Sequence, residues 1–115
     1  MILDRNAILG AQDLPHEDVA VPEWGGTVRV RMMTGTERDT LANAFVGDDG
    51  KPDMSGYRQR LLAATMIDEA GQRLFSADDL SAIGAKSAAA LDRVFTVSDR
   101  LNQLGTTAVE IALGN

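Results

Sequence analysis

Residues 21–30 read VPEWGGTVRV, and this stretch decides how the first third of the chain folds. It contains the only tryptophan, Trp24, directly before the pair Gly25-Gly26, and valines alternate with polar residues beyond that pair. Such alternation is typical of a strand with one buried face. A type I′ turn needs positive φ at both central residues, and glycine adopts positive φ at little steric cost. The pattern therefore predicts a β-hairpin over about residues 19–33 that turns at Gly25-Gly26.

The two faces of this hairpin differ in chemistry. The return strand has an apolar side and a mostly polar side, which are formed by Val28, Val30 and Met32 and by Thr27, Arg29, Arg31 and Met33. Strict pairing places Trp24 opposite Thr27, on the side of the arginines, whereas a bulge at Pro22 would turn it inward. We expect Trp24 to be partly exposed and to form a partner-binding surface with Arg29 and Arg31. The alternative for the arginines is a solvated strand face that pairs with nearby acids.

Capping signals mark where the helices after the hairpin begin. Thr34 and Glu37 fit a capping box, and so do Ser76 and Asp79. Expected elements are a short helix over 3–10, helices over about 35–46, 57–68, 77–84 and 87–104, and a frayed C-terminal segment over 106–115. The expected fold is a single domain, 1–115, of the α+β class, mostly α. An N-terminal β-hairpin packs on a small helical bundle in this arrangement.

The composition excludes several classes of protein. The 115 residues carry a net charge of −6, which argues against a general binder of nucleic-acid phosphates. No cysteine is present, so disulfides, zinc thiolates and thiol nucleophiles are ruled out. No apolar run approaches the roughly 18 residues of a membrane span, and the N-terminus lacks a secretory signal pattern. The chain is therefore expected to work inside the cell, away from membranes and nucleic acid.

Candidate catalytic and metal-binding residues fit structural roles better than chemical ones. Asp48, Asp49 and Asp53 lie in a Gly- and Pro-rich stretch, but their spacing does not match a calcium-binding loop. His16 is the only histidine and has no second ligand nearby in the sequence. No serine lies in a nucleophile elbow, and no phosphate-binding glycine loop occurs. We expect no catalytic, metal-binding or cofactor-binding residue, no small-molecule substrate and no enzyme activity.

The order of these elements resembles the tail assembly chaperones of long-tailed bacteriophages and prophages. The segments that carry the resemblance are VPEWGGTVRVR (21–31), TGTERD (34–39) and the run from Ile67 to Leu104, within which 68–79 read DEAGQRLFSADD. The likeness extends over most of the chain, about residues 1–104.

This resemblance implies a non-enzymatic assembly factor. Its partners would be the tape measure protein, whose apolar stretches it protects, the major tail tube protein, and other copies of itself. Such a protein acts in the host bacterial cytoplasm and is absent from the mature virion. The resemblance also implies a longer form made by a −1 ribosomal frameshift, and the ending Leu113-Gly114-Asn115 is compatible with slippery codons. The alternatives are a head–tail connector or minor tail protein retained in the virion, and a small transcriptional regulator or antitoxin.

Overall fold

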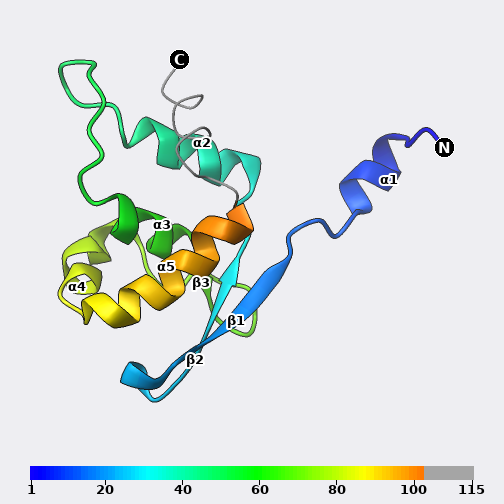
Figure 1. Cartoon of the computed structure of the whole chain (residues 1–115). Coiled ribbons are helices and arrows are strands. Elements are labelled where there is room, and N and C mark those ends of the chain that lie inside the picture. Colours follow the sequence, from blue (N-terminus) through cyan, green and yellow to red (C-terminus); the bar gives the residue numbers. More distant parts are fainter. Residues whose placement is uncertain (103–115) are drawn as a thin grey trace.

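The hairpin forms the first two strands of a three-stranded antiparallel sheet with the order β1-β2-β3 (Figure 1). In the computed structural model, which describes residues 1–102, β1 is His16–Val21, β2 is Gly26–Arg31 and β3 is Met66–Ile67. β1 pairs with β2 along its whole length, and β2 pairs with β3 at Arg29 and Val30. The fold is α+β and mostly α, as expected, with about 49% helix and 17% strand.

The turn of the hairpin is longer than the sequence predicts. Val21 lies opposite Gly26, so four residues connect the strands, and the first three form the 3₁₀ helix η1, Pro22–Trp24. Proline lacks the N–H needed for strand pairing, and its φ suits the first position of a helical turn. Pro22 therefore favours the start of η1 over a continuation of β1. Only Gly25 needs positive φ, at 73°. The predicted pairing of Trp24 with Thr27 is therefore wrong, because Ala20 faces Thr27.

Two helical segments begin at the predicted capping boxes. α2, Gly35–Asn43, begins with the capping box in which the Glu37 N–H donates to Thr34 Oγ1 and the Thr34 N–H donates to Glu37 Oε1. Ser76 and Asp79 form the second box. The other helical elements are α1 (Arg5–Gly10), α3 (Tyr57–Thr65), η2 (Ala77–Asp79), α4 (Leu80–Gly84) and α5 (Ala88–Asn102). The predicted helix end at Leu104 and the predicted frayed segment 106–115 lie outside the described residues.

The helix expected over 57–68 ends three residues early. Met66 and Ile67 leave α3 and add β3 to the sheet, and Asp68 then turns the chain by accepting the N–H groups of Ala70 and Gln72. Pairing with β2 thus outweighs the helical pattern of this stretch. A single sequence does not reveal this pairing.

The main core lies between the sheet and the helices α3 and α5. Val21 and Val30 of the hairpin, Leu62 of α3 and Val94 of α5 are fully buried in one cluster. α5 is strongly amphipathic and contacts both β1 and β2. Because α3 is buried along its C-terminal half, Leu61 to Thr65, it is the central helix. The hairpin is therefore fixed to the helices through its valine face, as the sequence predicts.

A smaller aromatic group surrounds Tyr57 at the start of α3. Its ring lies 5.2 Å from that of Phe45 and 5.6 Å from that of Phe95, measured between centroids. The hydroxyl donates to Asp99 Oδ1 at 3.2 Å. Burial, followed by the charge of Asp99, raises the pKa of Tyr57 to about 12. The neutral phenol is thus the form that the fold stabilises.

We expect the phenolate of Tyr57 to titrate near pH 12 in the folded protein, because burial and Asp99 disfavour the anion. The pKa of Tyr57 in the folded state lies above the unfolded value of about 10. The stability that the folded state gains from keeping this phenol neutral is therefore fully present below pH 10. It is lost as the pH rises towards 12. Tyr57 is the only tyrosine, so phenolate absorbance measures it alone. Asp99→Asn should bring the pKa partway back, and ordinary titration near pH 10 in the folded wild-type chain would contradict the expectation.

Candidate protein-binding site

Arg29, one of the predicted partner-binding residues, is engaged across the hairpin. Its Nε donates to Asp18 Oδ1 at 2.7 Å and its Nη2 to Asp18 Oδ2 at 3.1 Å. This bidentate hydrogen bonding lowers the pKa of Asp18 and raises that of Arg29. The side chain is still 33% exposed, so Arg29 lies on the polar face of the sheet as expected.

Arg31 has a structural partner as well. Its Nη2 donates to Glu37 Oε1 at 2.8 Å, on the carboxylate that also accepts the Thr34 N–H. The Arg31 side chain is only 19% exposed. The residue therefore ties β2 to the capping box of α2 and offers less free surface than the sequence predicts.

Trp24 packs towards the other face of the hairpin. It is half-buried against the main core cluster, together with Val28. Within residues 1–102 its buried Nε1 has no hydrogen-bond partner. The neighbouring Glu23 accepts from Arg93 of α5 at 3.0 Å, which holds the tip of the hairpin against that helix. The structure thus brings Arg29 and Arg31 together on one face but not Trp24, and the binding role of all three stays a prediction.

We expect Arg31→Met to lower the free energy of unfolding by about 1–2 kcal/mol, because a hydrogen bond to the charged Glu37 carboxylate is lost in a largely covered position. The matched control is Arg93→Met, which removes an ion pair whose arginine is 51% exposed and should change stability by less than about 0.5 kcal/mol. Urea unfolding measures both variants. Equal losses in the two variants would remove the structural role assigned to Arg31.

A groove that the sequence does not predict lies between α2, α3 and the segment around η2. It is open to solvent on one side and has a volume of about 160 Å³. Its apolar lining comes from Leu41 of α2, Ala44 directly after α2, Ala63 and Ala64 of α3, Ala77 of η2 and Leu80 of α4. A cavity of about 150 Å³ accepts a group the size of benzene, so this groove has room for a single large aliphatic or aromatic side chain. Four of these six residues are alanines, and their small size leaves the space open.

The rim of the groove is charged. Arg60, Arg73 and Glu37 line it, and Glu37 is already engaged by Arg31. The Nε of Arg73 donates to the Ala63 carbonyl, whereas the buried Nε of Arg60 has no partner within residues 1–102. The groove therefore suits an apolar side chain that stands beside a carboxylate, as on an amphipathic helix.

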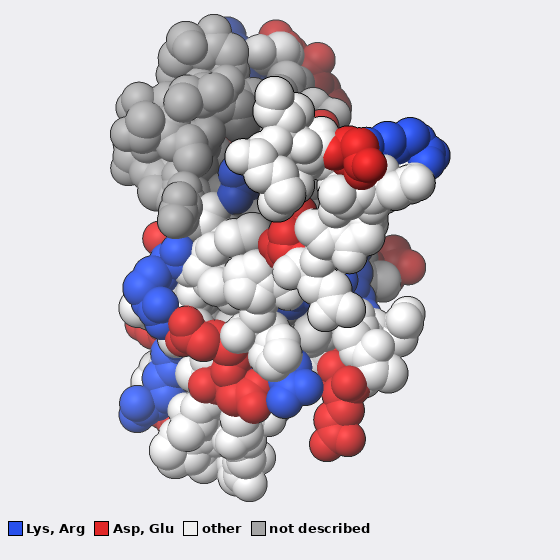
Figure 2. All heavy atoms as spheres, turned by 90° about the vertical axis from the view of Figure 1, so that its right-hand side faces the viewer, with Lys and Arg blue, Asp and Glu red and all other residues white. Residues whose placement is uncertain are grey.

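The remaining surface mixes charges of both signs. Figure 2 shows acidic and basic side chains interspersed on one face of the molecule. Besides the pairs of Arg29 and Arg31, ion pairs join Arg58 to Asp92, Arg93 to Glu23 and Arg100 to Glu17.

The residues weighed for metal or acid–base chemistry have local structural roles. Asp49 accepts the Lys51 N–H and Asp53 accepts the Ser55 N–H, so both stabilise the loop after α2. His16 is exposed at the first position of β1. Among residues 1–102, no group of three or more potential ligand side chains is arranged to hold a metal ion. No helix in the same part of the chain has the length and apolarity needed to cross a membrane.

Comparison with known proteins identifies a structural relative. No family model and no curated protein matches the sequence. The structure of the bacteriophage HK97 tail assembly chaperone aligns with this chain at a TM-score of 0.57 and 22% sequence identity. The alignment covers 76% of this chain and 85% of that chain. The resemblance drawn from the sequence is thus confirmed at the level of the fold, which is the fold of a phage tail assembly chaperone.

Proposed function

We propose that this chain is a tail assembly chaperone of a long-tailed bacteriophage or prophage. It binds the tape measure protein and recruits tail tube subunits in the cytoplasm of the host, performs no catalysis and leaves before the virion is complete. The observation that carries the proposal is the shared fold with the HK97 tail assembly chaperone over most of both chains.

The groove between α2, α3 and η2 supports this proposal and is the site that we assign to the tape measure protein. Its cavity admits one apolar side chain, and its arginine rim favours a nearby carboxylate. A long helical client presents such sites repeatedly along an amphipathic face. A single contact of this size is weak. When many molecules of this chain bind along one client, the overall binding becomes stronger through multivalency. Weak contacts also allow release when tube subunits arrive.

Co-expression with the tape measure protein encoded in the same genome tests the proposal. We expect the chain to keep the client soluble and to co-purify with it. Ala77→Glu places a charge in the groove and should reduce co-purification at least about tenfold. Ala82→Glu, on exposed α4 surface outside the groove, is the matched control and should bind normally. A client that stays insoluble in the presence of the wild-type chain would contradict the proposed function. Equal binding by both variants would show that the client binds outside the groove.

The frameshifted longer form stays a prediction that belongs to this proposal. A slippery site and an open −1 frame after codon 113 are expected in the gene, and the nucleotide sequence tests both.

A further inference from the structure

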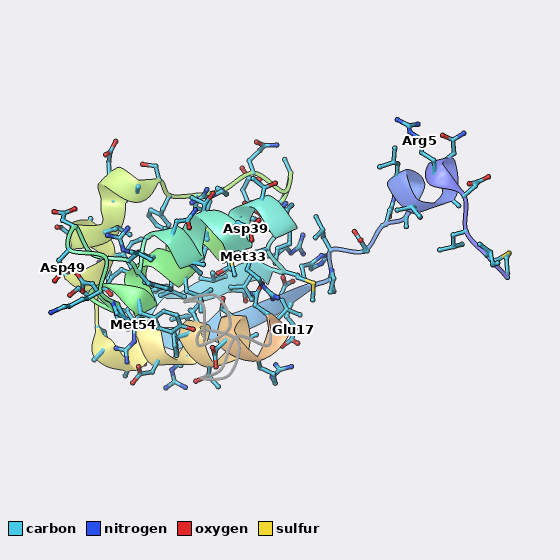
Figure 3. All side chains as sticks on the ribbon, turned by 90° about the horizontal axis from the view of Figure 1, so that it is seen from above. Arg5, Glu17, Met33, Asp39, Asp49 and Met54 are labelled. Atoms are coloured by element: carbon cyan, nitrogen blue, oxygen red, sulfur yellow. The ribbon has the colours of Figure 1, made fainter. Side chains whose placement is uncertain are left out.

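The groove between α2, α3 and η2 is elongated along the helices that form it. Thr36, Thr40 and Ala44 line it and stand four residues apart, so it follows one face of α2 for two turns, about 12 Å. On α3, Arg60 and Ala64 are also four residues apart, which corresponds to about 6 Å along the helix. Helix α1 stands well apart from α2 and α3 and leaves the groove uncovered (Figures 1 and 3). A client helix lying in the groove therefore meets the apolar lining and Arg60 through side chains one turn apart.

Arg60 is a rim cation without a partner in the described part of the chain. Its buried Nε has no hydrogen-bond partner, and its guanidinium forms no ion pair, within residues 1–102. The charge of Arg60 contributes to the lowered pKa of Asp53, after the hydrogen bonds between Asp53 and Ser55. Asp53 Oδ1 accepts the Ser55 N–H at 2.9 Å, so this carboxylate is held in its own loop.

The other two charged groups of the rim already have partners. Arg73 Nε donates to the Ala63 carbonyl at 3.1 Å, which ties this side chain to α3. The Glu37 carboxylate accepts from Arg31 Nη2 at 2.8 Å, which ties it to β2. Arg60 is therefore the charged group of the rim with the most unused hydrogen-bonding capacity.

We propose that Arg60 is the specificity-determining residue of the groove. It pairs with a carboxylate of the tape measure protein that stands three or four residues from the apolar side chain in the groove. The assignment rests on the proposed function, since the tape measure protein is the occupant named there. An arginine fork receives a carboxylate through two parallel hydrogen bonds, and such charge-assisted bonds are stronger than neutral ones.

The client segments that bind this chain thus share an anchor-and-acid signature. It consists of a large aliphatic or aromatic residue with an Asp or Glu three or four positions away, on the same face of a helix. Apolar stretches without the acid fill the groove but leave Arg60 without its partner. The chain therefore distinguishes amphipathic, acidic segments of the client from segments that are only apolar.

Fluorescence anisotropy with peptides of about 20 residues, which tile the tape measure protein encoded in the same genome, tests the signature. We expect tiles with the anchor-and-acid signature to bind at least about tenfold more tightly than tiles with an anchor alone. In the tightest-binding tile, replacing the acid by its amide should weaken binding by the same factor. Arg60→Gln in the chain should do so as well. Arg58→Gln is the matched control, because Arg58 lies on the same helix, pairs with Asp92 and does not line the groove.

Combining the substitutions shows whether Arg60 and the client carboxylate are in direct contact. If they are, Arg60→Gln has no further effect on a tile that already carries the amide, so the two losses are not additive. Arg60→Glu should bind a tile with Arg in place of the acid more tightly than it binds the original tile. Urea unfolding checks that the variants fold, and the amide tile with the wild-type chain tests the contact even if they do not.

The outcomes separate this inference from the proposed function. Additive losses, equal binding of acid and amide tiles by the wild-type chain, or tight binding by tiles without the signature would each overturn the role of Arg60 while leaving client binding intact. Failure of every tile to bind the wild-type chain would contradict client binding itself and the role of Arg60 with it.

Discussion

Replacing Leu62 with alanine is expected to lower the free energy of unfolding by about 3 kcal/mol. Leu62 is fully buried in α3, in the cluster that joins Val30 of the sheet to Leu91 of α5. Truncation removes the transfer free energy of the lost methyl groups and leaves a cavity that the surrounding helices and sheet fill only in part. Urea unfolding of the purified chain measures the loss.

Leu74→Ala is the matched control for this substitution. Leu74 is 48% exposed, so the same change in chemistry should alter stability by less than about 0.5 kcal/mol. A loss below about 1 kcal/mol for Leu62→Ala, or similar losses for both leucines, would contradict the position of α3 at the centre of the core.

Asn102→Ala is expected to cost about 2 kcal/mol through a different mechanism. Asn102 is fully buried, its Oδ1 accepts the Met33 N–H at 2.7 Å, and its Nδ2 donates to the Ser98 carbonyl at 2.9 Å. This side chain links the end of α5 to the chain between β2 and α2. Alanine would leave the Met33 N–H buried without its acceptor, and such a group costs about 1–3 kcal/mol.

The control for Asn102 is Asn43→Ala, because Asn43 is exposed at the end of α2. It should change stability by less than about 0.5 kcal/mol. Hydrogen exchange adds a local measurement, since the Met33 amide should lose protection in Asn102→Ala. Unchanged protection and unchanged stability would show that this buried hydrogen bond does not hold the helix to the sheet.

The parts of the fold that the sequence predicts well depend on local chemistry. The Thr34–Glu37 and Ser76–Asp79 boxes form within four residues, so the start of each helical segment can be predicted from the residue types alone. The buried valine face of the hairpin follows from simple alternation along the strands.

The parts that the sequence does not predict depend on contacts between distant residues. Met66 and Ile67 continue a helical pattern, and only pairing with Arg29 and Val30 makes them a strand. Gly25-Gly26 suggested a two-residue turn, but Pro22 begins a 3₁₀ turn before it. The ion pairs of Arg29 and Arg31 with Asp18 and Glu37 likewise arise from strand register and packing.

The candidate groove escaped prediction for a related reason. Its signal is a set of small residues on separate elements, among them Ala44, Ala63 and Ala77. Alanine is common in any helix, so the sequence does not indicate which alanines face one another across an unfilled space. Only the packing of α2 and η2 around α3 makes this set a site.

We propose that the chain acts during tail assembly and then leaves. Quantitative mass spectrometry of purified virions, with the major tail tube protein as the internal reference, tests it most directly. We predict tube protein in its full amount and no peptide of this chain above background. A fixed, stoichiometric number of copies per virion would contradict the claim and would make the chain a structural component such as a connector or minor tail protein.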